Sequence, residues 1–221
     1  MKKKTLMSWS SGKDSAWALY QLQQNKEVDV VGLFCTVNKE FNRVAMHGVR
    51  LELLQKQAES VGLPLEVIEI PNPCSNAEYE KIMGQFVARA KNNSIKYFAF
   101  GDLFLEDIRN YREEKLQGSG IKALFPIWEI PTETFSREMI SAGLRTVITC
   151  IDPRKLTEEF AGREFNGDFL TSLPETIDPC GENGEFHSFV FDVPMFKEKI
   201  AISVGEIVNR DRFVFADILP A

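Results

Sequence analysis

The residues best placed to do chemistry stand together near the start of the chain, in the segment Ser10-Ser11-Gly12-Lys13-Asp14-Ser15. Serine and aspartate favour caps and turns, and Gly12 lets the backbone approach a ligand closely. A helix that begins near Lys13 would direct its free N–H groups and the positive end of its dipole at this loop. Such a loop binds phosphate, although an ordinary strand-to-helix turn with a good cap is the simpler alternative.

Two commoner phosphate motifs do not fit this loop. A Walker A loop would need glycine in place of Met7 and serine or threonine in place of Asp14. A dinucleotide-binding fingerprint needs three spaced glycines, and only Gly12 is present.

A second group of reactive side chains stands in the later half of the chain, in the segment Asp178-Pro179-Cys180-Gly181-Glu182-Asn183-Gly184-Glu185-Phe186-His187-Ser188. Carboxylates, an amide and a histidine surround two glycines and the start of a predicted strand. A rigid glycine loop can turn such groups into one pocket for a substrate with donors of its own. The alternative is a β-turn with exposed acids.

Three further residues are candidates for the same site. Asp102 follows Gly101 at the carboxyl end of a predicted strand, where it would serve as a metal ligand or cap the next helix. Arg112 lies in a charged helix, which is usually a solvated face, but it could reach a phosphate or a carboxylate. His47 is placed at the start of a helix, where its charged form is disfavoured and where it would contact substrate or merely cap.

The elements that position these residues alternate between strand and helix. Strands are predicted around residues 6–8, 28–37, 65–70, 96–100 and 121–125. Helices are predicted from Lys13, from His47-Gly48 to Gly62, after a cap at Asn76, and after Asp102. Five strands alternating with four helices predict an α/β fold with a doubly wound, right-handed parallel sheet of five strands.

The sequence pattern changes near residue 130, after which the predicted elements are shorter and the chain has more glycine and more loops. We expect one domain, which carries the phosphate loop, over residues 1–130 and a smaller α+β subdomain, which carries the second group of reactive side chains and would bind the substrate, over 131–221. The second part should contain a helix from Thr132 and strands over residues 144–151 and 186–193. Two last strands, 199–208 and 212–218, would cover the core or form the contact of a homodimer.

Composition narrows the class of protein. The chain has 221 residues, of which 44% are hydrophobic, and a net charge of −6. This charge argues against broad nucleic-acid binding. No apolar run is long enough to span a membrane, and the start from Met1 to Lys4 leads into a short strand, so we expect a cytoplasmic protein. The four scattered cysteines suggest neither a disulfide framework nor a zinc knuckle, and most should be buried, inert thiols.

Taken together, these features resemble those of the diphthine–ammonia ligase family of ATP pyrophosphatases, in an arrangement similar to its bacterial-type members. The resemblance rests on four motifs: the loop from Ser10 to Ser15, Gly101-Asp102, Pro126-Ile127-Trp128 and Glu182-x-Gly184-Glu185. It implies an adenine-nucleotide α-hydrolase-like fold, in which this pyrophosphate loop (PP-loop) holds the β and γ phosphates of ATP. It also implies ATP with magnesium, and amide formation through an adenylated carboxylate that ammonia attacks.

The residue types and positions, taken together with this resemblance, give expected roles for individual residues. Lys13, Asp14 and Glu185 would be catalytic. ATP would be bound by Ser10, Ser11, Gly12, Lys13, Asp14, Ser15, Cys35, Thr36, Gly101 and Asp102. The substrate would be bound by His47, Arg112, Trp128, Glu182, Asn183, Glu185 and His187. Magnesium would be held by Asp14 or Asp102.

This chain departs from the family pattern at several positions. Ser11 stands where the family usually has a glycine, and a serine fits there if its φ is negative. Eukaryotic and archaeal members show Glu-Gly-Gly-Glu-Tyr-Glu-Thr at the second site, where this chain has Asn183, Phe186 and His187-Ser188. Residues 105–108 replace an Asp-Tyr-Gln-Arg pattern. ATP chemistry should survive these changes, whereas we expect a different acceptor from diphthine.

Two other functions stay open on the same sequence. One is sulfur transfer to a tRNA base, also through adenylation, which would use a cysteine pair such as Cys150 and Cys180 and a basic face. The other is a nucleotide-binding sensor that binds ATP without turnover. Fold-level analogy does not decide between these functions.

Overall fold

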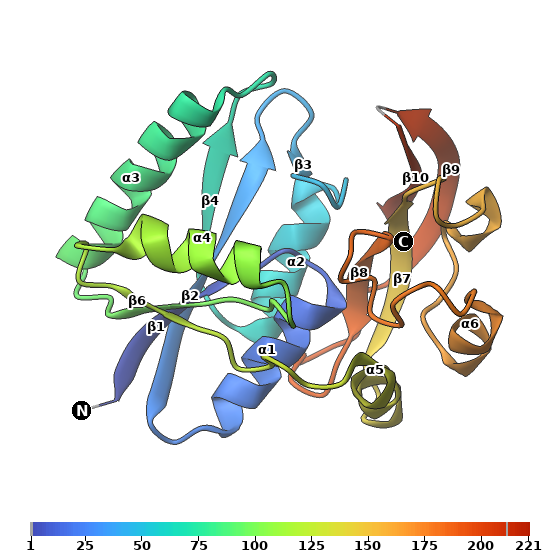
Figure 1. Cartoon of the computed structure of the whole chain (residues 1–221), viewed down its shortest axis with the longest axis horizontal. Helices are drawn as coiled ribbons and strands as arrows, with labels where there is room; N and C mark the ends of the chain where they lie inside the picture. The colour runs from blue at the N-terminus through green and yellow to red at the C-terminus, as the bar shows by residue number, and fades with distance from the viewer. Residues whose placement is uncertain (1, 211) are drawn as a thin grey trace.

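A computed structural model describes residues 2–210 and 212–221 as a two-sheet α/β fold (Figure 1). Met1, part of the predicted start, lies outside the described residues. The elements follow in the order β1 (Lys3–Ser8), α1 (Lys13–Gln24), β2 (Val28–Asn38), β3 (Arg43–Val44), α2 (Leu51–Val61), β4 (Leu65–Ile70), α3 (Asn76–Asn92), β5 (Tyr97–Ala99), α4 (Glu106–Leu116), β6 (Lys122–Leu124), α5 (Thr132–Ser141), β7 (Arg145–Ile151), the 3-10 helix η1 (Glu158–Phe160), α6 (Gly167–Ser172), β8 (Phe186–Asp192), β9 (Ile202–Arg210) and β10 (Phe213–Pro220).

The first sheet confirms the predicted doubly wound architecture. Five strands run parallel in the spatial order β4, β2, β1, β5, β6. The chain moves outward from β1 to β4 and then crosses to the other side of β1 for β5 and β6. The strand order therefore reverses between β1 and β5, which is where open α/β sheets bind ligands. The pattern did not predict the short β3, which pairs antiparallel with the carboxyl end of β2.

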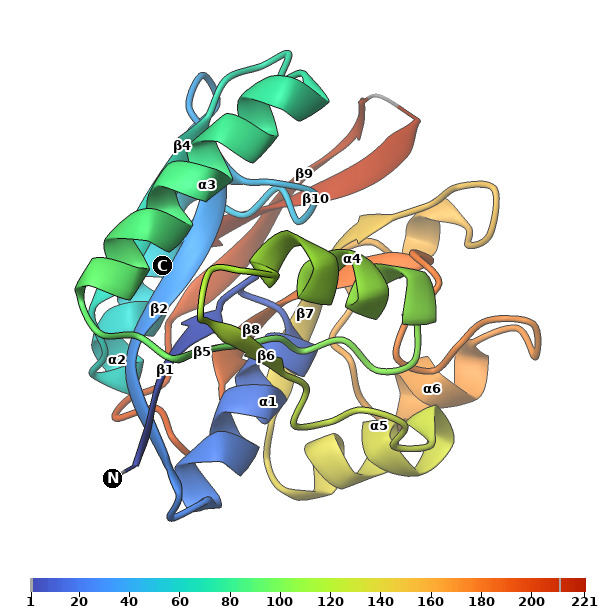
Figure 2. The ribbon, with the colours of Figure 1, turned by 60° about the vertical axis from the view of Figure 1, so that its left-hand side comes forward.

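Helices cover both faces of this Rossmann-like sheet (Figures 1 and 2). On one face, α3 and α4 pack over a cluster of aromatic side chains that includes Phe34, Phe86 and Phe98. On the other face, α1 and α2 lie between the two sheets, where Trp17 and Leu53 belong to a larger apolar core. The apolar runs of the strands are thus buried on both faces, as expected for a parallel sheet.

The start of α2 corrects one prediction. The helix begins at Leu51, not at His47-Gly48, because Ala45 to His47 form a turn and Gly48 has a φ of 68°. A left-handed residue cannot continue a helix. The predicted end of α2 at Gly62 is confirmed: Gly62 has a φ of 78°, and its N–H donates to the carbonyl of Ala58.

The start of α3 is shifted by one residue from the prediction. Ser75, not Asn76, is the N-cap. The Ser75 hydroxyl accepts the N–H of Glu78, and the Glu78 carboxylate accepts the N–H of Ser75. This reciprocal pair is a capping box, which satisfies the N–H groups of both Ser75 and Glu78.

The second sheet belongs to the smaller C-terminal α+β part of the predicted fold. It is antiparallel, in the order β8, β7, β10, β9, and is accompanied by α5, α6 and η1. The two predicted last strands correspond to β9 and β10. Val214, Ala216 and Ile218 on β10 are buried, so β10 covers the core, whereas most of β9 is exposed. The domain boundary near residue 130 and a dimer contact through this region stay predictions.

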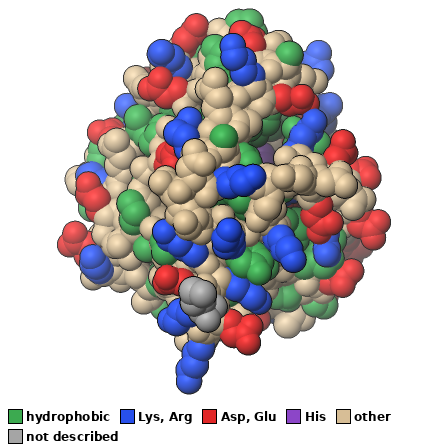
Figure 3. All heavy atoms as spheres, turned by 90° about the vertical axis from the view of Figure 1, so that its left-hand side faces the viewer, with side chains coloured by type: hydrophobic (Ala, Val, Ile, Leu, Met, Phe, Trp, Pro, Cys, Tyr) green, Lys and Arg blue, Asp and Glu red, His purple; other side chains and the backbone are tan. Residues whose placement is uncertain are grey.

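Charge is unevenly distributed over the surface. Figure 3 shows basic side chains gathered over the middle of one face, with acidic side chains mostly around its margin. A local basic face therefore coexists with the net charge of −6. Within residues 2–210 and 212–221, no helix has both the length and the apolar character needed to cross a membrane.

Candidate active site at the switch point

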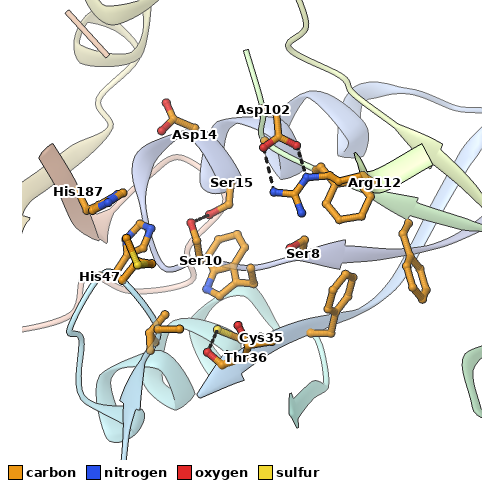
Figure 4. A pocket seen from close by; sticks show the side chains of 18 of the residues that line it. Ser8, Ser10, Asp14, Ser15, Cys35, Thr36, His47, Asp102, Arg112 and His187 are labelled. Atoms are coloured by element: carbon orange, nitrogen blue, oxygen red, sulfur yellow. Dashed lines mark hydrogen bonds and ion pairs between the residues drawn. The ribbon is translucent and has the colours of Figure 1, made fainter. Parts of the chain in front are cut away.

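A pocket of about 620 Å³ opens at the switch point, at the carboxyl ends of β1, β2 and β5 (Figure 4). The loops after these strands form much of its wall, and the segment that leads into β8 forms another part. Between α3 and α4 the pocket continues over apolar side chains. The predicted site residues that line it are Ser10, Lys13, Asp14, Ser15, Cys35, Thr36, His47, Gly101, Asp102, Arg112, Glu182 and His187.

The predicted phosphate loop lies between β1 and the first turn of α1. The Ser10 hydroxyl lies 3.1 Å from the Ser15 hydroxyl and accepts the N–H of Gly12 at 3.4 Å. Ser15 also donates to the Gly12 carbonyl at 2.9 Å. Both hydroxyls are thus held at the wall of the pocket beside the start of α1, where backbone N–H groups lack helical partners. This arrangement suits an anion.

Two glycines allow the loop its close contacts. A Cβ atom on Gly12 would lie 2.8 Å from Cε1 of His47, and one on Gly101 would lie 2.8 Å from backbone atoms of Asp14 and Ser15. The backbone at Gly101 cannot move away, because β5 pairs with β1. Gly101 therefore serves to let β5 end directly against the first turn of α1.

Ser11 adopts a conformation that the sequence did not predict. Its φ is 72°, in the left-handed region, so the condition of a negative φ, under which a serine would fit easily at this position, is not met. Ser11 is fully buried and does not line the pocket. Among the described residues, its hydroxyl has no hydrogen-bond partner. The chain therefore tolerates here a strained residue where a glycine would fit without strain.

Lys13 points from the phosphate loop toward the C-terminal part of the chain. Its ammonium donates to both carboxylate oxygens of Asp14, at 2.9 and 2.8 Å, and to the carbonyl of Cys180. It also lies over the rings of Phe165 and Phe186, 5.8 and 5.4 Å from their centroids. Burial alone would lower the pKa of Lys13, but Asp14 and other negative groups outweigh burial and raise it. The ammonium is therefore a fixed positive charge between the phosphate loop and the second predicted site.

Asp102 and Arg112 bind each other at the edge of the pocket. Arg112 Nε and Nη2 donate to the two carboxylate oxygens of Asp102 at 2.5 and 3.0 Å. The guanidinium also lies over the ring of Phe100, at 4.3 Å. Asp102 does not cap α4, whose N-cap is Leu105. Arg112 was predicted to lie on a solvated face or to reach a phosphate or a carboxylate. The structure shows it bound to a carboxylate of the protein itself, that of Asp102.

The carboxyl group of Glu182 lies at the pocket, and its pKa is raised. Its Oε1 accepts the N–H of Leu103 at 2.8 Å, which fixes it beside the loop after β5. Burial raises the pKa of Glu182 to about 7, and the carboxylates of Asp14 and Asp102 add to this shift. A carboxyl group that titrates near neutral pH can exchange protons with a substrate.

His47 and His187 stack on each other across the two parts of the chain. Their ring centroids lie 4.6 Å apart, and Nδ1 of His47 lies 3.1 Å from the Ser188 carbonyl. A carbonyl only accepts, so this nitrogen carries the proton and Nε2 keeps its lone pair. Burial lowers the pKa of His47 to about 4 and that of His187 to about 3. Both rings are neutral at pH 7, and for His47 the cause is burial, not the helix start that the sequence predicted.

Three predicted substrate residues lie away from the pocket lining. Glu185 is buried behind the loop, where its carboxylate accepts from the amide of Asn183 at 3.2 Å and from the N–H of Asp178 at 3.5 Å. Asn183 is exposed. Trp128 packs beside Phe125 and under Arg109, outside the pocket.

Three cysteines, Cys35, Cys150 and Cys180, are protonated thiols. Burial raises the pKa of Cys35 and of Cys150 to about 12 and also raises that of Cys180. All four cysteines are free. Cys35 lines the pocket at the end of β2, where its thiol lies 3.6 Å from the Thr36 carbonyl. The expectation of buried, unreactive thiols is confirmed for these three; Cys74 is partly exposed.

Gln57 holds the loop from behind and contacts Trp9, which lines the pocket, and neither was predicted as a site residue. The side-chain carbonyl of Gln57 accepts the indole N–H of Trp9 at 2.8 Å, and its amide donates to the carbonyls of Ser11 and Val190. From β8, the Ser188 hydroxyl accepts the N–H of Lys13 at 3.3 Å. A signal for Gln57 did exist: it is a polar residue in the apolar stripe of α2.

Magnesium was predicted at Asp14 or Asp102. In the described ranges, no group of three histidine, cysteine, aspartate or glutamate side chains is arranged to hold a metal. Both aspartates line the pocket, each in an ion pair with a basic side chain. Mg²⁺ is usually held by one or two carboxylates together with substrate phosphates and water. These residues therefore fit a magnesium ion that arrives with a polyphosphate.

Comparison with known proteins gives consistent matches. A family model described as diphthamide synthase N-terminal domain matches residues 2–123, and one described as diphthamide synthase C-terminal domain matches residues 131–218.

Curated relatives named diphthine–ammonia ligase are similar to the chain at low identity. The protein of Schizosaccharomyces pombe is 30% identical over 95 residues, which cover 41% of this chain and 16% of that protein. The Rattus norvegicus protein is 25% identical over 71% of this chain and 61% of its own length. The Mus musculus protein is 24% identical over 95% of this chain and 86% of its own length. The chain thus spans less than two thirds of the first two of these relatives.

Proposed function

The chain belongs to the diphthamide synthase family, and from this premise we propose that it is an ATP-dependent ligase of the ATP pyrophosphatase type. It would adenylate a carboxylate, release pyrophosphate, and let an amine displace AMP to form an amide. One observation carries the proposal: the phosphate loop and the segment from Gly181 to Ser188 line the same pocket. A nucleotide and an acceptor can therefore meet there.

The phosphate loop would hold the β and γ phosphates. The hydroxyls of Ser10 and Ser15 and the N–H groups of Asp14 and Ser15 in the first turn of α1 would supply donors, and Lys13 would supply a fixed positive charge next to them. Magnesium, bound with ATP near Asp14 or Asp102, would offset further phosphate charge. The adenine would lie against Cys35 and Thr36 at the end of β2, which leaves the α phosphorus open to the acceptor carboxylate.

Glu182 is the residue that we assign as the base for the incoming amine. Of the three candidates, Glu185 does not line the pocket and His187 has a pKa of about 3, too low to remove a proton efficiently. Glu182 lines the pocket, is fixed by the N–H of Leu103, and has a pKa of about 7. The ammonium form of the attacking amine would lose its proton to this carboxylate.

We propose an acceptor other than diphthine, the substrate that the relatives' name indicates. The argument is the charge at the second site. His187 is a neutral ring stacked on His47, at a position where the family pattern places an acid. A neutral ring in place of a carboxylate presents a different charge to the acceptor, so the pocket would suit a different acceptor. Ammonia and a carboxylate-bearing small molecule or protein would be the partners, in the cytosol.

The first test is a product analysis by mass spectrometry. The protein is incubated with ATP, magnesium and ammonium, with and without an extract of metabolites and proteins. AMP and pyrophosphate that appear only with extract support the ligase and provide an assay for the acceptor. ADP and phosphate, or ATP left intact, contradict it, and intact bound ATP indicates the sensor.

A pair of lysine variants serves as the control for that test. Lys13→Met should abolish AMP formation in the same extract, because it removes the positive charge beside the loop. Lys56→Met removes an exposed lysine of α2 and should leave AMP formation unchanged. Equal activity in both variants would trace the AMP to a contaminant. For the sulfur-transfer alternative, the protonated state of Cys150 and Cys180 offers no thiolate nucleophile.

A further inference from the structure

Gln57 is a fully buried amide in the centre of the molecule, and each of its polar atoms is used. Its Oε1 accepts the indole N–H of Trp9 at 2.8 Å. Its Nε2 donates to the carbonyl of Ser11 at 3.0 Å and to that of Val190 at 2.6 Å. One side chain of α2 therefore joins the end of β1, the phosphate loop and β8.

The carbonyl that Gln57 holds belongs to the strained residue of the loop. Ser11 has a φ of 72°, and its carbonyl accepts a second hydrogen bond from the N–H of Val190 at 2.9 Å. A serine leaves the left-handed region readily unless its surroundings fix it there. The peptide that follows Ser11 carries the N–H of Gly12, so a change at Ser11 would turn the N–H groups that begin α1.

We propose that Gln57 is a positioning residue that keeps Ser11 left-handed and so aims the phosphate loop at the nucleotide. The proposal rests on the proposed function, because it takes the loop to bind the phosphates of ATP. Gln57 itself lies behind the loop and does not line the pocket. Gln57 affects binding through its hydrogen bond to the Ser11 carbonyl. Gln57 is needed because a serine at position 11 does not stay left-handed by itself.

The test is a double-mutant cycle between these two positions. Gln57→Met keeps the size of the side chain and removes both donors together with the acceptor of the Trp9 indole N–H. In the Ser11 protein it should weaken the binding of ATP and of inorganic pyrophosphate about tenfold, the value of one good hydrogen bond. In the Ser11→Gly protein the same change should cost less than about threefold, because glycine adopts a positive φ without the steric penalty that serine carries. Adenosine binding, which does not use the loop, should change in neither background. Isothermal titration calorimetry measures all three ligands.

Ser60→Ala is the matched control. Ser60 is a buried polar residue one turn further along α2, and its hydroxyl donates to the Glu198 carbonyl at 2.7 Å without touching the loop. An equal loss of pyrophosphate affinity in Ser60→Ala, or equal losses from Gln57→Met in both backgrounds, would overturn the proposal. If Gln57→Met does not fold, Gln57→Glu keeps an acceptor for Trp9 and loses at least one donor, and it should show the same coupling.

The experiments distinguish a failure of the proposed ligase function from a failure of the role proposed for Gln57. If the unaltered protein binds neither ATP nor pyrophosphate, the proposed function fails. If it binds both and forms AMP but the cycle shows no coupling, only the role of Gln57 fails.

Discussion

Replacing Ser11 with glycine should make the protein more stable, although the change removes a side chain from its interior. Ser11 is fully buried with a φ of 72°, and its hydroxyl has no hydrogen-bond partner within the described residues. Both features cost free energy in the folded state. Ser11→Gly removes both and leaves the two hydrogen bonds to the residue-11 carbonyl in place.

The size of the gain follows from three terms. Relief of the left-handed conformation is worth about 1 to 2 kcal/mol. Removal of a buried hydroxyl without a partner is worth about 1 to 3 kcal/mol. The greater freedom of glycine in the unfolded chain opposes these by about 0.5 to 1 kcal/mol. The free energy of unfolding should therefore rise by about 2 kcal/mol, and the melting temperature by roughly 4 to 8 °C for a chain of this length.

Ser11→Ala separates the two favourable terms. Alanine removes the hydroxyl but keeps the Cβ atom that disfavours the left-handed region, so it should be intermediate between serine and glycine. Thermal and urea unfolding of the three proteins at pH 7 measure the order. A glycine variant less stable than the original, or an alanine variant as stable as the glycine one, would refute the assignment of strain to Ser11.

Three further predictions concern charge in the site. The rate of AMP formation should rise through an acid limb near pH 7, where the Glu182 carboxyl ionises, and a pH profile of Glu182→Gln should lack this limb. Because the pKa values of His47 and His187, about 4 and about 3, lie below the usual 6.5, the unfolded chain takes up protons first as the pH falls. Each ring should therefore make the unfolding free energy fall by about 1.4 kcal/mol per pH unit as the pH drops from 6.5 toward its folded-state pKa, so His187→Asn should reduce the slope of unfolding free energy between pH 4 and 6 by about that amount. Lys13→Met leaves the Asp14 carboxylate without its partner and should lower kcat/KM for ATP at least about a hundredfold in a pyrophosphate-release assay.

Local patterns explain why much of the fold was predictable. The apolar run of β2 and the repeat of Leu54, Ala58 and Val61 on α2 each identify an element without knowledge of the rest. The alternation of strands and helices then restricts the sheet to few topologies, and the switch point follows from the order of the strands. For this reason the sequence alone predicts that the phosphate loop and Asp102 lie at one edge of the sheet.

The remaining features of the site depend on contacts between distant parts of the chain. The stacking of His47 on His187 joins residues 140 positions apart, by their numbers, and no local pattern reports it. Glu185 matches a family motif by position, yet the turn between Gly181 and Gly184 directs its carboxylate into the interior. The left-handed Ser11 was unpredictable for the same reason, because its conformation is fixed by Gln57 and Val190 and not by its neighbours in sequence.

The phosphate loop is therefore less independent than its motif suggests. The N–H of Lys13 donates to the Ser188 hydroxyl, its ammonium donates to the Cys180 carbonyl, and the Ser11 carbonyl accepts the N–H of Val190. All three partners belong to the segment that also carries Glu182. An acceptor that displaces this segment would therefore also shift the groups proposed to hold ATP. A sequence motif can locate such a loop, but the shape that binds phosphate is completed by residues from the other half of the chain.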